Sequence, residues 1–499
     1  MEDSLKKRYA IKLLASLING IINIVLIAIV PKALGPVGFG QFSYLQQFFA
    51  QVVAFLDAGT SLAFFTKLSA RHDRKELITF YALFSLLLLA ILYIFIFSID
   101  FLGLGVKLLP DIPKEYIFFG LWFGFFTWLT QIYIKISDAY ALTVSVELIK
   151  IGHKVFSLIL LLLIMHYFTF NLSVYFYFHY VALSSFLLII TLLLIKKGIF
   201  TNEVFTLKIT YKKLTQEFYR FSSPLFVFNF VAIFIALFDI WLLQYVSGSV
   251  ETGYYGLAYS IAAMCFLFTG AMTPIITREF AKSYESKDMQ KIKNLFKRYI
   301  PMLYSVAAYF GVFIAFESEN LIGIFADEKF KDAYLVLIIM AFYPIHQTYG
   351  QLSGSLFFAM EETKLYRNIG LITSLIGLVL SFIFLYYLEL GAVGFAWKMV
   401  IVQVISVNIQ LYYNMKFLNL KMSEFVLHQL LSVLFFILLA FASSSVIYTT
   451  SNAIFNFLLT GTLYTFLVVI GTILFPYVFS TTHKEIQTFL KTKFLKKGL

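Results

Sequence analysis

The stretch PKALGPVGFGQFSY, residues 31–44, places two prolines and three glycines between two long apolar segments. A residue without a Cβ reaches backbone conformations that other residues avoid, and it lets neighbouring helices approach closely. The apolar segments on both sides are long enough to form helices. We therefore interpret residues 31–44 as a tight turn that joins two long helices.

The composition of the chain is that of an integral membrane protein. Of its 499 residues, 60% are hydrophobic and only 13% are charged, against roughly 25% charged in soluble domains. Apolar runs of about 20 residues recur from end to end, and no polar segment is long enough to fold separately. The first apolar run is too long for a cleavable signal peptide, so we expect it to act as its own insertion signal.

The sequence disfavours two classes of partner. The one cysteine, Cys265, lies in an apolar run, which excludes a disulfide framework and a thiolate metal site. The net charge of +12 would suggest nucleic acid in a soluble protein. In a membrane protein it is explained better by basic residues in cytoplasmic loops, so we expect no nucleic-acid partner and no metal.

Hydropathy predicts fourteen membrane-spanning helices and an all-α fold. The runs are about twice the length of barrel strands and are apolar on all sides, which disfavours a β-barrel. The predicted spans are 11–33, 38–66, 77–99, 115–136, 140–166, 171–195, 221–246, 252–275, 299–316, 332–359, 366–388, 391–413, 427–448 and 453–479.

The distribution of basic residues predicts the orientation. With fourteen spans, most of the 39 Lys and Arg residues fall on one side of the membrane. The other side holds only Lys32, Lys107, Lys114, Lys329 and Lys331. Because cytoplasmic loops retain basic residues, both termini are predicted to be cytoplasmic, and the turn at 31–44 is predicted to be outside.

The turn sequence recurs, which predicts an internal repeat. TGYYGLAY (252–259) aligns with VGFGQFSY (37–44), pairing Gly38 with Gly253, and AVGFAWKM (392–399) is a third echo. Six spans separate the first two copies, so they point the same way, as parallel repeats do. We predict an N-terminal six-helix lobe (1–195), a basic cytoplasmic linker (196–220), a C-terminal six-helix lobe (221–413) and two additional helices with a tail (414–499).

These features together resemble a known family. Fourteen spans, LGPVGFGQFSY (34–44), DAGT (57–60) and FDIWLLQYVSGSVETGYYGLAYSI (238–261) are similar to polysaccharide-unit flippases of the O-antigen (Wzx) type. These belong with the multidrug/oligosaccharidyl-lipid/polysaccharide exporters. The resemblance implies a two-lobed, V-shaped transporter that moves an undecaprenyl-diphosphate-linked oligosaccharide from the inner to the outer leaflet for surface polysaccharide such as O-antigen or capsule. It also implies a bacterial inner membrane and glycan polymerases or glycosyltransferases as neighbours.

Charged residues inside predicted spans are the candidate site. A charge near the bilayer centre costs about 2.5–3.5 kcal/mol on insertion scales, so each needs a partner, a wet cavity or a function. Glu147, Lys150 and Lys154 fall at i, i+3 and i+7, on one helix face. Glu147 can pair with Lys150, leaving Lys154 as surplus positive charge beside the titratable His153. The face is either a self-neutralised stripe between helices or a cavity wall that attracts a diphosphate.

The remaining candidates are more dispersed. Arg220 opens a span where the helix dipole disfavours a cation, so we expect it at the inner mouth. Lys398 either snorkels outward or joins the cavity. Asn23 and Gln47 are amides suited to sugars or to helix–helix hydrogen bonds. The aromatic run YFYFHY (175–180) is interpreted as an interfacial belt.

The chain carries no enzyme constellation. Its predicted outer loops hold carboxylates but no histidine or nucleophile arrangement, and no nucleotide-binding glycine loop occurs. We therefore expect a transporter without catalytic residues or cofactors, coupled to a proton or sodium gradient if to any, with Asp57 and Asp239 as weak candidates for ion coupling. The alternatives are an ion-coupled multidrug or lipid II exporter of the same superfamily, or a polytopic glycan-assembly enzyme.

Overall fold

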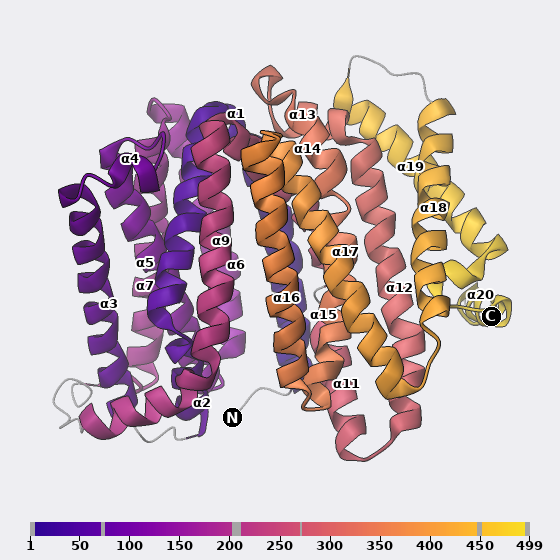
Figure 1. The fold of residues 1–499 in the computed structure, drawn as a ribbon, viewed down its shortest axis with the longest axis horizontal. Helices are drawn as coiled ribbons and strands as arrows, with labels where there is room; N and C mark the ends of the chain where they lie inside the picture. The colour runs from indigo at the N-terminus through magenta and orange to yellow at the C-terminus, as the bar shows by residue number, and fades with distance from the viewer. Residues whose placement is uncertain (1–4, 71–74, 202–210, 270–271, 447–451, 495–499) are drawn as a thin grey trace. The chain divides into compact units, whose positions relative to one another are not determined.

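The structure is a computed structural model that describes residues 5–70, 75–201, 211–269, 272–446 and 452–494. Every regular element within these ranges is helical (Figure 1). This confirms the predicted all-α fold. Helices suit the membrane because their backbone groups are all satisfied within the segment.

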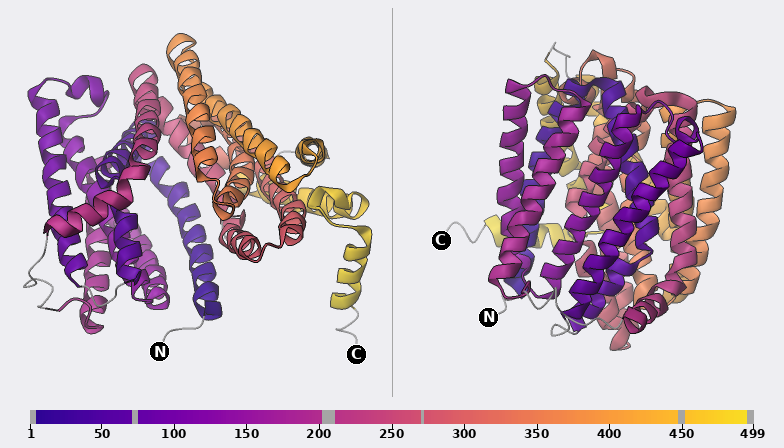
Figure 2. Two further views of the ribbon diagram at one scale, coloured as in Figure 1. Left: turned by 60° about the horizontal axis from the view of Figure 1, so that its bottom comes forward. Right: turned by 90° about the vertical axis from the view of Figure 1, so that its left-hand side faces the viewer.

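The chain divides into two compact units, Met1–Gly253 and Tyr254–Leu499. The right-hand view of Figure 2 faces the first unit, and its long helices run side by side there. Its helices are α1 (Leu5–Asp57), α2 (Thr60–Ala70), α3 (Glu76–Phe101), α4 (Gly105–Leu108), α5 (Lys114–Ala139), α6 (Thr143–Tyr167), α7 (Leu172–Lys196) and the larger part of α9 (Tyr211–Ala262).

The second unit holds the end of α9 and the rest of the chain. Its elements are η1 (Ala263–Cys265), α10 (Phe266–Thr269), α11 (Thr273–Glu285), α12 (Met289–Phe316), α13 (Ser318–Phe325), η2 (Glu328–Phe330), α14 (Ala333–Met340), α15 (Tyr343–Ala359), α16 (Thr363–Ser381), η3 (Phe382–Tyr387), α17 (Gly391–Leu418), α18 (Met422–Val446), α19 (Ala453–Leu474), η4 (Pro476–Phe479) and α20 (His483–Phe494). Its core includes Phe280, Phe296, Tyr304, Tyr349 and Tyr464, all buried.

Eleven helices in the described ranges are long and apolar enough to span a membrane, against fourteen predicted. Two of the eleven, Gly20–Asp57 and Phe230–Cys265, each contain a bend at a glycine, so each comprises two arms. At about 1.5 Å of rise per residue, both arms of α1 reach the roughly 30 Å of a hydrocarbon core. The predicted span 332–359 is present as α14 and α15, each too short alone. The count therefore differs because helices are merged or divided at bends.

The turn at 31–44 is a bend inside α1 and not a loop. Gly35 has φ 69° and ψ 173°, and Gly248 in α9 has the matching values of 78° and −177°. Only glycine adopts this backbone region readily. Both glycines thus join two helical arms without intervening loop residues, which an L-residue with a Cβ would resist.

Five residues after each bend, a second glycine packs against the other bent helix. A Cβ on Gly40 would overlap the carbonyl oxygen of Ser249, and a Cβ on Gly253 would overlap that of Pro36. Gly35 and Gly248 are 213 positions apart, and so are Gly40 and Gly253. The repeat is therefore present, but the predicted pairing of Gly38 with Gly253 was wrong by two residues.

The boundary between the compact units lies inside α9, whereas the sequence predicts a linker at 196–220. The first arm of α9 is held in unit 1 by side chains that donate to backbone carbonyl groups in and just after α4. Trp241 Nε1 donates to the Lys107 carbonyl at 2.7 Å, and Gln244 Nε2 donates to the Pro110 carbonyl at 3.1 Å. The predicted division into lobes, linker and C-terminal pair stays a prediction.

A candidate anion pocket in the first unit

Glu147, Lys150 and Lys154, which are predicted to share one face of α6, include the expected ion pair. Lys150 Nζ donates to Glu147 Oε1 at 2.9 Å, and the side chains are about a quarter and a tenth exposed. Lys154, one turn further along α6, makes no ion pair or hydrogen bond with any residue that the structure describes. Glu147 and Lys150 therefore neutralise each other, and the charge of Lys154 stays unpaired within the described residues, as predicted.

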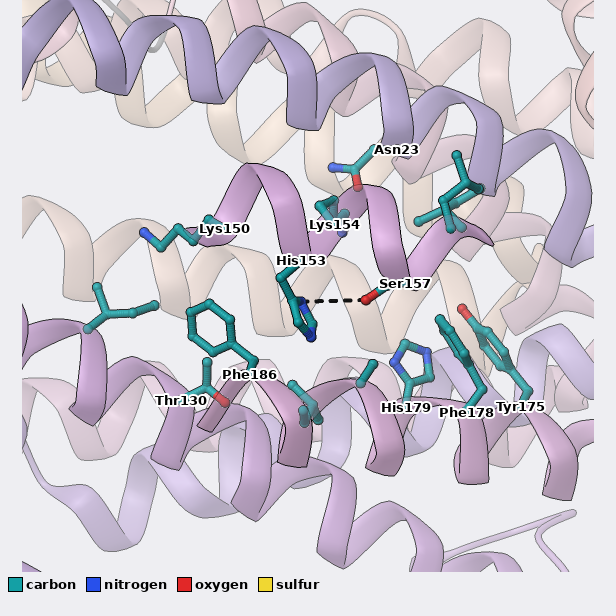
Figure 3. Close-up of a pocket in the computed structure, with 15 residues that line it drawn as sticks. Asn23, Thr130, Lys150, His153, Lys154, Ser157, Tyr175, Phe178, His179 and Phe186 are labelled. Atoms are coloured by element: carbon teal, nitrogen blue, oxygen red, sulfur yellow. Dashed lines mark hydrogen bonds between the residues drawn. The ribbon is translucent and has the colours of Figure 1, made fainter. Parts of the chain in front are cut away.

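Both lysines line a cavity of about 400 Å³ within unit 1. Four helices contribute to its wall, since α1 packs on α6, α5 packs on α7, and the two pairs contact each other (Figure 3). The lining residues are Asn23, Leu26, Thr130, Ile134, Lys150, His153, Lys154, Ser157, Leu158, Tyr175, Phe178, His179, Ala182, Leu183 and Phe186. Figure 3 shows Asn23 pointing from α1 toward Lys154 on α6.

Two histidines line the same cavity, His153 from α6 and His179 from α7. His153 Nε2 is 3.0 Å from Ser185 Oγ, and its Nδ1 is 3.5 Å from Ser157 Oγ. His179 stacks on Phe42 and meets the edge of Tyr175, while its Nε2 is buried with no hydrogen-bond partner in the described chain. A buried imidazole nitrogen without a partner is costly, so this histidine is not explained by packing alone.

The opposite wall is aromatic and comes from the run interpreted as an interfacial belt. Tyr175, Phe178 and His179 face the cavity, with Phe186 two turns further along α7. The signal was present in the sequence, because 175, 178, 179, 182, 183 and 186 follow the i, i+3, i+4 spacing of one helix face. Composition alone predicts an interfacial belt for this run, whereas its helical spacing indicates a cavity wall.

The charge balance of the cavity wall is positive. Among the residues that the structure describes, its lining includes two ammonium groups and two imidazoles but no carboxylate, and Glu147 lies outside it, paired with Lys150. An ammonium ion binds phosphate as a point charge, with three donors and no fixed fork, so it can release as well as bind. The arrangement is suited to a phosphate-bearing ligand that passes through.

The other predicted residues whose side chains the structure describes do not line this cavity. Lys398 is buried in α17 of the second unit, with Nζ 5.3 Å from the centre of the Phe395 ring, so it does not snorkel. Asp239 is buried in α9, and Gln47 is half-buried in α1. The side chain of Arg220 lies outside what the structure describes. Of the predicted set, the cavity brings together Asn23, Lys150 and Lys154.

Asp57 is the centre of a hydrogen-bonded cluster at the end of α1. Its carboxylate accepts from Ser61 N (3.1 Å), Ser61 Oγ (2.9 Å), Tyr81 OH (2.9 Å), Thr60 Oγ1 (3.2 Å) and Trp128 Nε1 (3.3 Å). Ala58 and Gly59 both have positive φ, which breaks the chain between α1 and α2. The groups around Asp57 are donors, so the geometry suits a carboxylate that closes the helix break. Its role in ion coupling stays a prediction.

The fold and cavity define a class, the multi-pass α-helical membrane transporter. Over residues 5–277 the chain matches the family described as "Polysaccharide biosynthesis protein", which is more than half of its length. The chain belongs to this family. The resemblance drawn from the turn motifs is thereby confirmed at the level of the family.

Individual relatives are more distant. The chain is 25% identical over 189 residues to a probable low-salt glycan biosynthesis flippase, Agl15, of Haloferax volcanii, and the match covers 38% of each chain. Among solved structures, the lipid II flippase MurJ in an inward closed conformation has a TM-score of 0.68 at 16% identity, covering 92% of this chain and 98% of that one.

A multidrug resistance transporter of the MATE family, in an inward-facing conformation, has a TM-score of 0.59 at 14% identity, covering 84% of this chain and 96% of that one. At these identities the likeness shows a shared fold and not a shared substrate. These relatives and neighbours are flippases and transporters, not enzymes.

Proposed function

We propose that this protein is a flippase for a lipid-linked glycan, translocating a polyprenyl (undecaprenyl) diphosphate-linked oligosaccharide for surface polysaccharide assembly. The observation that carries the proposal is Lys154, which has no ion-pair partner among the described residues and lies in a cavity whose described lining includes no carboxylate. A diphosphate is the part of such a substrate that is most costly to move through a bilayer, because each charge near the centre costs several kcal/mol. A cationic cavity inside the protein lowers that cost.

The cavity also has the chemistry to hold the first sugar of the substrate. Its volume of about 400 Å³ falls in the roughly 300–1,000 Å³ range of ligand sites. The Asn23 amide offers a donor and an acceptor to sugar hydroxyls. The apolar faces of Tyr175 and Phe178 suit the C–H faces of a sugar ring. The rest of the oligosaccharide extends beyond this cavity.

The direction of transport follows from the predicted orientation. With both termini in the cytoplasm of a prokaryotic cell, the substrate moves from the inner to the outer leaflet of the plasma membrane by alternating access. The lipid tail stays in the bilayer while the headgroup crosses. A proton or sodium gradient is the proposed energy source, with Asp57 and Asp239 as the candidate coupling residues. Glycosyltransferases and a glycan polymerase are the proposed partners.

The test is surface glycan in cells that depend on this protein. Lys150→Ala and Lys154→Ala variants, separately and together, should lower surface glycan while their membrane levels stay normal. Lys297→Ala, on an exposed part of α12, is the matched control and should export normally. Normal surface glycan in the double variant would refute the proposal.

A transport assay separates this function from the alternatives. Purified protein in vesicles should translocate fluorescent polyprenyl-diphosphate oligosaccharide faster than lipid II or a cationic dye. Preference for lipid II would assign the chain to the lipid II exporters. Preference for the dye would assign it to multidrug export, which the cationic cavity disfavours because like charges repel.

A further inference from the structure

Unit 1 has a second hollow, which shares no residue with the cavity on α6. It has a volume of about 460 Å³ and lies between the end of α3, α4 and the start of α5. Its wall is largely apolar and includes Ile96, Phe97, Val106, Leu109, Ile117 and Phe118. Val106 is 82% exposed and Phe97 is 62% exposed. Figure 1 shows α4 at the same end of unit 1 as the bend of α1.

The segment that forms one side of this hollow is held rigidly. Four of its carbonyl groups each accept a hydrogen bond from a side chain of α1 or α9. Tyr44 OH donates to Leu108 (2.8 Å), Gln41 Nε2 to Asp111 (2.8 Å), Trp241 Nε1 to Lys107 (2.7 Å) and Gln244 Nε2 to Pro110 (3.1 Å). Irregular backbone at the edge of a membrane needs such partners. They also preform the hollow, so a ligand meets a fixed wall.

Charged residues of both signs stand at the rim. Asp100, Asp111 and Lys114 line the hollow, and Lys114 Nζ donates to Asp100 Oδ1 at 2.5 Å. The Asp111 carboxylate has no hydrogen bond or ion pair with a residue that the structure describes, and Asp111 is exposed. Lys114 is also exposed and its ammonium group has three donors, so it can keep its ion pair with Asp100 and also donate to a second anion.

We propose that this hollow binds one zwitterionic phospholipid with a primary-amine headgroup. An acyl chain occupies the apolar hollow, the ammonium group bonds Asp111, and the phosphate bonds Lys114. The end of a span is where lipid headgroups lie, and exposed apolar side chains such as Val106 require a hydrocarbon neighbour there. In the predicted orientation the lipid belongs to the outer leaflet.

The rim charges select this lipid over others. Two carboxylates and one ammonium group leave a negative balance at the rim, which repels an anionic phospholipid and equally a lipid diphosphate. A quaternary amine lacks the N–H donors that a carboxylate accepts. The site is therefore separate from the transport cavity in position and in sign of charge, and it does not depend on the proposed function.

The experiment measures lipid retained by the intact purified protein in native mass spectrometry. Phosphatidylethanolamine, phosphatidylcholine and phosphatidylglycerol with the same acyl chains are added separately. Wild type should retain phosphatidylethanolamine at least about five-fold better than phosphatidylglycerol, the ratio expected for one net hydrogen bond of about 1 kcal/mol. Asp111→Asn should lose this preference, and Val106→Glu should retain little of any lipid.

Two features keep the result interpretable. Asn tolerates the positive φ of Asp111 (59°), so Asp111→Asn leaves the backbone bonds of the segment in place. Leu102→Glu adds the same charge as Val106→Glu at an exposed position outside the hollow, and should behave as wild type. Equal retention of the three lipids by wild type, or unchanged retention in Asp111→Asn and Val106→Glu, would overturn the proposal.

Discussion

Gly40 of α1 packs against the carbonyl group of Ser249 in α9, at a point where any Cβ would overlap the oxygen. The same relation holds between Gly253 and Pro36, so the two bent helices cross with local two-fold character. The crossing also lies beside the segment after α4, since the carboxylate of Asp111 is 3.0 Å from where a Gly248 Cβ would be. The two copies of the turn motif therefore pack directly against each other.

Gly40→Ala and Gly253→Ala should each destabilise the protein. The added methyl group meets backbone, which cannot turn away as a flexible side chain can, so we expect a loss of about 1–3 kcal/mol or more. The measurement is thermal unfolding of the purified protein. Gly38→Ala is the control, because its Cβ would lie 3.4 Å from Leu34 Cβ. Equal unfolding temperatures for all three variants and wild type would contradict the crossing.

The two lysines of α6 should respond in opposite ways to loss of charge. Lys150→Met leaves Glu147 buried without its partner, which should cost about 1–3 kcal/mol because Lys150 is a quarter exposed. Lys154→Met removes a charge that has no partner in the described chain, so stability should be unchanged or slightly higher. Thermal unfolding and surface glycan measured together give the sign of each effect. A stability loss in Lys154→Met as large as in Lys150→Met would indicate that Lys154 is structural.

The Asp57 cluster should contribute more to the free energy of unfolding than any one of its hydrogen bonds does. Asp57→Ala leaves the Ser61 and Trp128 donors without this acceptor, while Tyr81 OH keeps Thr60 Oγ1 at 3.1 Å, and each buried donor without an acceptor costs about 1–3 kcal/mol. Tyr81→Phe removes one donor and leaves the others, so it should cost about 1 kcal/mol. Denaturation of the two variants in the same detergent provides the comparison. A cost for Asp57→Ala no greater than that for Tyr81→Phe would mean that the cluster does not hold the α1–α2 break.

The start of α20 should depend on pH. Thr482 and Glu485 form a capping box, in which Thr482 N–H donates to Glu485 Oε2 (3.1 Å) and Glu485 N–H donates to Thr482 Oγ1 (3.3 Å). The hydrogen bond from Thr481 Oγ1, with that from Thr482 N–H, holds the pKa of Glu485 below its ordinary value of 4.5.

Because the folded-state pKa of Glu485 is lowered, its contribution is present above the unfolded value and is lost as pH falls through the folded one. The protection factors of the amides at residues 483–488, which are corrected for intrinsic exchange, should therefore fall between pH 5 and pH 3. Glu485→Gln should abolish this pH dependence. Protection that is identical at both pH values in wild type would contradict the role of the carboxylate.

The sequence predicted which charged residues of α6 pair and which one keeps a positive charge at the site. The i, i+3, i+7 spacing of Glu147, Lys150 and Lys154 predicted both the ion pair and the unpaired charge, since residues on one helix face need no tertiary information. The glycine-rich turn predicted the repeat. Its register was wrong because one motif contains several glycines, and only backbone torsion angles identify the bends at Gly35 and Gly248.

Other features depend on tertiary contacts. Nothing in the sequence places Asn23 of α1 opposite Lys154, because 130 residues separate the two along the chain. Lys398 was expected either to snorkel or to join the cavity, and its burial against Phe395 depends on the packing of α17. The side chains that donate hydrogen bonds to the carbonyl groups of residues 107–111 come from α1 and α9, which are far from this segment in the sequence. Neither these bonds nor the hollow beside them could therefore be predicted.

The central claim is that Lys154 supplies a charge for the diphosphate of a lipid-linked sugar. The direct measurement is the dissociation constant of a short-chain polyprenyl-diphosphate sugar for purified wild type, Lys154→Gln and the surface control Lys297→Gln. We predict binding about 10–100-fold weaker in Lys154→Gln, as expected for loss of a hydrogen bond to a charged group, and unchanged binding in Lys297→Gln. Equal affinity in wild type and Lys154→Gln would contradict the account.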